Sequence, residues 1–195
     1  LLLSVAALIV FIGTLWPLIV ETLFNEKISV GAPFFELAFT PFIILLALLL
    51  PIGTILPWKR GKVANLKSNL LTVAILSVIS GSAVWSFQTG GRILAPIGAS
   101  LSVWIVLGSL FDIGKRIKLF EVTLLNSLKR LTKLPRGDLG RFVAHMGFGL
   151  MIFGVSAVSA WEIEDIRVAR LNEPYQVEDY TIELTQVSEF AKFNY

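Results

Sequence analysis

Residues 142–160 read FVAHMGFGLMIFGVSAVSA, and they lie between Arg141 and Trp161. The stretch contains one ionisable side chain, His145, and is otherwise free of charge. A helix of about 20 residues crosses the roughly 30 Å of hydrocarbon in a bilayer. We therefore expect a transmembrane helix in which His145 lies about 6 Å along the axis from Arg141.

Four other apolar stretches have comparable length, at residues 2–23, 37–56, 70–87 and 93–111. Hydrophobic residues make up 55% of the chain, charged residues 16%, and the mean hydropathy is +0.76. The runs are continuous and lack the alternation of barrel strands, so helices are the expected spanning structure. The predicted fold is an all-α polytopic membrane bundle with five transmembrane helices. Pro17, Pro41 and Pro51 predict kinks or early helix ends, and Arg92 and Pro96 crowd the start of the fourth span.

The chain begins inside an apolar run, without an initiator methionine and without the basic segment that opens a signal peptide. We expect it to be part of a longer membrane protein. Cysteine is absent, which excludes disulfides, thiolate haem ligation and iron–sulfur clusters within these residues.

Basic residues gather in two connections between spans and predict the orientation. They are Lys59, Arg60, Lys62 and Lys67 in the first, and Lys115, Arg116, Lys118, Lys129, Arg130, Lys133, Arg136 and Arg141 in the second. The charged residues after Trp161 are mostly acidic. By the positive-inside rule the two basic connections are cytoplasmic and the acidic tail is outside.

Three connecting segments have their own patterns. Residues 117–134 predict an amphipathic helix, either in the inner headgroup layer or packed on the bundle. The outside loop 26–35 is expected to turn at Gly31 and Pro33. We divide the chain into transmembrane helices at 1–160 and an extracytoplasmic β segment at 161–195, with candidate strands at 168–171, 175–177 and 180–185. The acids of this segment are expected to form a solvated face.

Two interpretations of the role of His145 are open. It is either a neutral imidazole that hydrogen bonds a neighbouring helix or an axial ligand of haem iron. On a helical projection, Gly149, Ile152, Ser156 and Ser159 lie beside it and predict room for a flat macrocycle. Gly140, Ala144, Gly147 and Gly154 fall on another face, where we expect close helix packing.

Three motifs resemble one family. The first is GTLWPL at 13–18 followed by KISVGAPFF at 27–35, the second is AHMG at 144–147 with GVSAVSA at 154–160, and the third is FNY at 193–195. Together they resemble, in order and along the whole chain, the C-terminal part of the CcmF/NrfE family of cytochrome c-type biogenesis proteins. Trp16 and Met146 stand where that family usually has other apolar residues.

The resemblance implies a haem lyase subunit that attaches haem covalently to apocytochrome c at the periplasmic side of the bacterial inner membrane. His145 would be one of two axial histidines of a membrane haem b, which would reduce the incoming haem. Expected partners are apocytochrome c, the haem chaperone CcmE, a CcmH/CcmI-type subunit and membrane lipid, with no nucleic acid. The other haem ligand and the substrate-haem histidines would precede Leu1.

Two other functions stay open. The first is an NrfE-like paralogue dedicated to one cytochrome. The second is a non-enzymatic scaffold or transporter component, in which His145 only hydrogen bonds a neighbouring helix.

Overall fold

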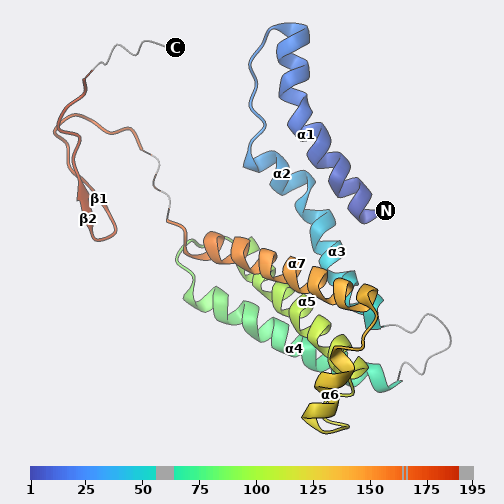
Figure 1. Ribbon diagram of the computed structural model, residues 1–195. Coiled ribbons are helices and arrows are strands. Elements are labelled where there is room, and N and C mark those ends of the chain that lie inside the picture. The colour runs from blue at the N-terminus through green and yellow to red at the C-terminus, as the bar shows by residue number, and fades with distance from the viewer. Residues whose placement is uncertain (56–63, 164, 166, 189–195) are drawn as a thin grey trace. The chain divides into compact units, whose positions relative to one another are not determined.

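The computed structural model describes residues 1–55, 64–163, 165 and 167–188. The chain forms two compact units, Leu1–Trp161 and Glu162–Tyr195. The first unit is helical and the second contains a small sheet (Figure 1). The basic residues Lys59, Arg60 and Lys62 and the motif at 193–195 lie outside the described residues.

The helices of the first unit follow the predicted apolar stretches. They are α1 (Leu2–Phe24), α2 (Ala32–Ala38), α3 (Thr40–Ile55), α4 (Ala64–Phe87), α5 (Leu94–Arg116), α6 (Leu124–Leu131) and α7 (Arg136–Trp161). Among the described residues, four segments are long and apolar enough to cross a membrane: Leu2–Phe24, Asn69–Phe87, Leu94–Arg116 and Arg136–Trp161. The polytopic helical prediction is confirmed.

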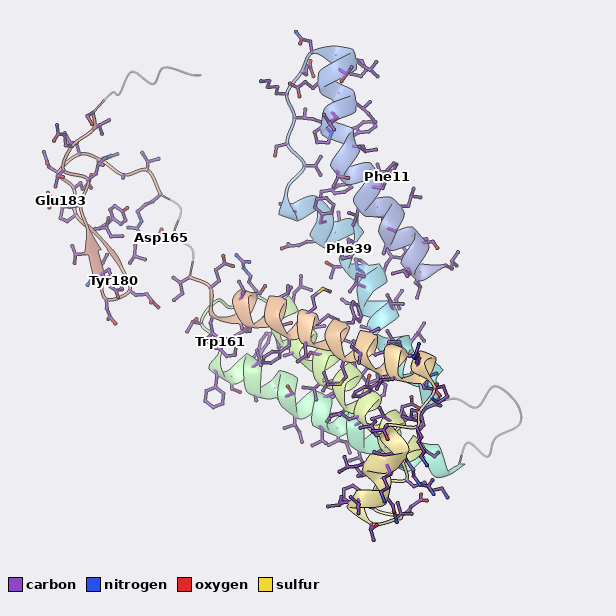
Figure 2. All side chains as sticks on the ribbon, in the orientation of Figure 1. Phe11, Phe39, Trp161, Asp165, Tyr180 and Glu183 are labelled. Atoms are coloured by element: carbon purple, nitrogen blue, oxygen red, sulfur yellow. The ribbon has the colours of Figure 1, made fainter. Side chains whose placement is uncertain are left out.

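The second predicted span, 37–56, is divided at Phe39 into α2 and α3. Figure 2 shows Phe39 at this junction. The physical reason is Pro41, which has no backbone N–H and whose ring disfavours a continuous helix through the residues before it. The 16 residues of α3 reach about 24 Å, less than the roughly 30 Å of a full span. Pro33 lies in the first turn of α2, so the predicted turn at this residue is a helix start instead.

Helix α5 is the central helix, although Arg92 and Pro96 lie close to its start. Pro96 lies in the first turn, where a missing N–H leaves no helical hydrogen bond unmade. Five of the nine buried residues of α5 are small, which lets neighbouring backbones approach closely. They are Ala95, Ala99, Ser102, Gly108 and Ser109. Helices α3, α4 and α7 all pack against α5.

Helices α5 and α7 run antiparallel and lie side by side (Figure 1). Gly98 of α5 lies against Ser156, because an ideal Cβ at Gly98 would approach the Ser156 Oγ to 2.0 Å. Gly149 of α7 lies against Val106 and Ile105 in the same way. The Ser102 hydroxyl also donates a hydrogen bond to the Gly149 carbonyl at 2.8 Å. These contacts define the register of the two helices.

We expect Ser102→Ala to destabilise the helical unit by about 0.5–1 kcal/mol, because it removes this interhelical hydrogen bond. Reversible unfolding of the purified full-length protein in mixed micelles measures the change. Ser82→Ala is the control, since the Ser82 hydroxyl is exposed and bonds only its own helix at Val78. An equal effect of both substitutions would show that the Ser102–Gly149 bond adds nothing.

The end of α7 at Trp161, which is the outer end in the predicted orientation, forms hydrogen bonds with the end of α4 and the residues that follow it. The backbone N–H groups of Thr89 and Gly90 donate to the Ala160 carbonyl at 3.0 and 2.8 Å. The indole Nε1 of Trp161, at the end of α7 in Figure 2, donates to the Phe87 carbonyl at 3.1 Å. At the opposite end, Asp138 and Arg141 of α7 form ion pairs with Arg116 and Asp112 of α5. Helix α7 is therefore fixed along its axis at both ends.

The predicted amphipathic helix at 117–134 is shorter than expected. Helix α6 covers only Leu124–Leu131, and turns replace the helix before it, where Lys118 and Phe120 adopt φ values of 55° and 71°. A left-handed backbone cannot continue a right-handed helix, so the prediction was wrong for 117–123. It was also wrong for 132–134, where turns follow α6. Leu124, Leu125 and Leu128 are exposed, a pattern that favours the headgroup-layer reading over packing on the bundle.

The second unit contains an antiparallel hairpin of β1 (Tyr175–Val177) and β2 (Tyr180–Ile182), with Tyr175 paired to Ile182 and Val177 to Tyr180. The predicted strand at 168–171 is reduced to a single bridge between Leu171 and Leu184. The described acidic residues of this unit are exposed, as expected of a solvated face. They include Glu173, Glu178, Asp179 and Glu183.

Candidate functional site

His145 lies in the first half of α7, one turn beyond Arg141, and its side chain is half-buried. The contacts of Gly149 with Ile105 and of Ser156 with Gly98 give the register of α5 against α7. By this register His145 is level with Ser109. The imidazole is therefore on the side of α7 that approaches α5, near the end of the bundle that carries the basic residues.

The His145 ring has no hydrogen-bond partner in the part of the chain that the structure describes. Two polar side chains of these helices bond other groups: the Ser102 hydroxyl bonds the Gly149 carbonyl, and Arg141 pairs with Asp112 and Asp138. A polar group at membrane depth is costly unless it is paired. Among the described residues, then, nothing satisfies the imidazole in the way that the hydrogen-bonding reading requires.

A metal at His145 would need most of its ligands from a source other than these side chains. No group of three or more His, Cys, Asp or Glu residues in the described ranges is placed to hold a metal ion. A single imidazole is sufficient only when another molecule supplies the remaining ligands. Porphyrin does so with four nitrogens and leaves the axial positions to the protein. The donor chemistry of His145 thus fits a haem, and a second axial ligand would come from elsewhere.

The sequence predicts that four residues beside His145 on α7 leave room for a macrocycle, and this prediction is wrong for two of them. Gly149 and Ser156 are buried against α5, so their small size serves close packing. By contrast, a Cβ at Gly140, Gly147 or Gly154 would meet no described atom within 4 Å. Within the described residues, the predicted close packing of these three glycines is therefore not found. Close packing occurs on the Gly149 face because α5 lies on the side of α7 that carries His145.

One apolar cavity of about 280 Å³ lies between α2, α3, α5 and α7. Its lining includes Ile152, Ser156 and Ser159, three of the residues that project beside His145, and Glu36. His145 itself does not line it. The cavity is in the half of α7 nearer Trp161, so it is separate from the imidazole.

Sequence reasoning missed the carboxylates closest to the site. Asp112 of α5 and Asp138 of α7 form ion pairs with Arg116 and Arg141 at the basic end of the bundle. The spacings Asp112–Arg116 and Asp138–Arg141 are four and three residues, which place each pair on one helix face. That signal was present in the sequence, but it does not show that the two pairs meet across helices.

The chain is similar along its whole length to proteins of cytochrome c maturation. It is 43% identical over 194 residues to the cytochrome c-type biogenesis protein ccl1 of Rhodobacter capsulatus, covering 100% of this chain and 29% of that protein. It is 36% identical over 184 residues to CycK of Bradyrhizobium diazoefficiens, covering 94% and 28%. It is 28% identical over 197 residues to CcmF of Escherichia coli, covering 100% and 28%.

The chain belongs to the CcmF family of cytochrome c-type biogenesis proteins. It spans less than a third of the length of these relatives. No protein-family model matches the chain, and no solved structure matches it. The predicted family is confirmed.

Two segments that carried the resemblance to the CcmF family meet in space. Gly13 of α1 lies against the rings of Phe34 and Phe35 of α2, since a Cβ at Gly13 would approach Phe34 Cε1 to 2.7 Å. The two rings pack edge to face with centroids 5.2 Å apart. The glycine at the start of the first motif and the aromatics at its end therefore form one packing contact, which holds α2 against α1.

Proposed function

We propose that this chain is part of a haem lyase subunit that attaches haem covalently to apocytochrome c, and that His145 is an axial ligand of a haem b in the membrane. The assignment of His145 depends on its surroundings: no described residue hydrogen bonds its ring, although the side chain is half-buried in a membrane-length helix. His145 is also the single histidine of this chain of the CcmF family.

The chain's own residues would position the ligand. The interhelical hydrogen bond at Gly149 and the ion pair between Arg141 and Asp112 lie on either side of His145 and hold α7 against α5. Held at both ends, α7 keeps the imidazole at one depth. When bound, the haem supplies reversible one-electron chemistry, which would serve to reduce the incoming haem iron. The ring nitrogen that does not bind iron requires its own hydrogen-bond acceptor, as ligating histidines usually have.

The location and partners belong to the same proposal. The multi-pass chain would lie in the bacterial inner membrane with the α6 end cytoplasmic and the hairpin of β1 and β2 periplasmic. Apocytochrome c, CcmE and a CcmH/CcmI-type subunit would act on the periplasmic side. The exposed leucines of α6, with Lys129 and Arg130 beside them, would contact the lipid of the inner leaflet.

The test is complementation of a bacterium that lacks its own CcmF-family gene. We expect the full-length protein to restore covalent haem on a panel of c-type cytochromes, measured by haem staining of denatured membrane and periplasmic fractions. Restoration of one dedicated cytochrome alone would indicate the NrfE-like function. Failure to restore any cytochrome, from a protein that accumulates in the membrane with its partners, would overturn the lyase assignment.

A further inference from the structure

Four charged residues join the basic ends of α5 and α7. Asp112 accepts from Arg116 at 3.2 Å on its own helix and from Arg141 at 3.0 Å on α7. Asp138 of α7 pairs with the same two guanidinium groups, at 3.2 Å to Arg116 and 3.4 Å to Arg141. Each carboxylate thus contacts both arginines, and we call these four residues the ion-pair cluster. Their side chains are between 18% and 34% exposed, so water does not fully surround them.

The ion-pair cluster is adjacent to His145. Arg141 precedes it by four residues, which is about one turn of helix, and so lies on the same side of α7. Asp112 is bound to that arginine from α5. On α5, Asp112 lies three residues, or about one helical turn, from Ser109, which is level with His145. The ring is therefore next to one positive and one negative charge that are paired with each other.

We propose that Asp112 and Arg141 are positioning residues that also set the reduction potential of the haem ligated by His145. This inference rests on the proposed function. Oxidised haem carries one more positive charge than reduced haem, so a nearby carboxylate favours the oxidised form and a nearby guanidinium the reduced form. Because the two groups are paired, their effects on the haem largely cancel. Removing either charge leaves the ion-pair cluster with one unit of net charge in a region of low dielectric constant, where screening is weak.

The two partners of one ion pair are expected to shift the potential in opposite directions. Asp112→Asn should raise the midpoint potential of haem b, and Arg141→Gln should lower it. A unit charge about 10 Å from a redox centre, at an effective dielectric constant of about 20, changes such an equilibrium by roughly tenfold. Tenfold corresponds to about 59 mV for a one-electron couple. The double variant should return most of the way to the wild-type potential.

Redox titration of the purified full-length protein, followed at the Soret band, measures these shifts. Lys129→Gln is the matched control for Arg141→Gln: it removes one positive charge from α6, where Lys129 is exposed and pairs with no described carboxylate. It should leave the potential unchanged. Arg141→Lys keeps the charge and should also keep the potential. If the Asp112→Asn protein does not accumulate, Asp138→Asn replaces it as the variant that removes a negative charge. It should raise the midpoint potential by a smaller amount.

Three results would overturn the inference. Shifts of the same sign in Asp112→Asn and Arg141→Gln would show that the ion pair acts only through the packing of α5 on α7. Unchanged potentials in both, with haem retained, would show that the charges do not act on the haem. A wild-type protein without haem would overturn the proposed role of His145, and this inference with it.

Discussion

Replacement of His145 by alanine in the full-length protein is expected to remove the membrane haem b. Alanine offers iron no ligand, and no group of several metal-binding side chains in the described residues could replace the imidazole. A haem held by a single remaining axial ligand loses the contact that fixes it between helices. The Soret absorbance per protein, with haem quantified by the pyridine haemochrome method, should fall to nearly nothing.

The fold should survive this substitution. The His145 side chain is half-buried and bonds no described residue, so its truncation breaks no hydrogen bond within these residues. The variant should accumulate in the membrane and elute as a single species in size-exclusion chromatography. Met146→Leu is the matched control, because Met146 is the adjacent residue and its thioether is the other side chain nearby that can ligate haem iron.

The control separates a ligand from a packing residue. Met146→Leu keeps apolar volume in the same turn of α7 and should retain the haem. Full haem content in His145→Ala would refute the assignment of this residue. Loss of haem in Met146→Leu with retention in His145→Ala would instead move the ligand to the neighbouring sulfur.

Gly108→Ala is expected to destabilise the helical unit by about 1–3 kcal/mol, the usual cost of forcing atoms into a packed interior. An ideal Cβ at Gly108 would lie 2.6 Å from the Pro51 Cβ. Pro51 is fully buried in α3, and its ring cannot rotate away as a flexible side chain would. The backbones of α3 and α5 would have to separate. Reversible unfolding in mixed micelles, followed by tryptophan fluorescence, measures the loss.

Gly147→Ala makes the same chemical change in a helix of the same unit. No described atom lies within 4 Å of the added methyl group at this position. Alanine is favoured over glycine in a helix by roughly 0.5–1 kcal/mol, so this variant should be as stable as the wild type or slightly more stable. Equal losses in the two variants would show that Gly108 is not a contact point between α3 and α5.

The glycines of α7 show that the sequence does not predict which face of a helix packs against its neighbours. Helical projection separates the Gly149 face of α7 from the Gly147 face, but it does not say which of them meets another helix. We expected the Gly147 face to pack, and the structure packs the Gly149 face against Ile105 and Val106. The small residues of α5 were equally visible in the sequence, yet their partners on α3 and α7 were not.

The break at Phe39 could be predicted from the local sequence, whereas the ion-pair cluster could be predicted only in part. A proline at position 41 predicts a helix end nearby from its own chemistry, and the division of α2 from α3 follows that rule. The spacing of Asp112 from Arg116 predicts a pair on one helix. Joining that pair to Asp138 and Arg141 requires knowing that two helices, 20 residues apart in sequence between Arg116 and Arg136, lie antiparallel.

The sequence by itself determined the membrane-length helices, the separation of a basic end from an acidic tail, the single histidine inside one helix, and the family. Each of these depends on the length, charge or order of residues in one segment, and hydrocarbon thickness and membrane charge act on segments one at a time. Only the tertiary structure decided that α5 is the central helix, that His145 lies on the side of α7 that meets it, and that Asp112 and Arg141 pair next to the imidazole. Those features depend on which surfaces of different helices fit together, and that fit is a property of pairs of helices.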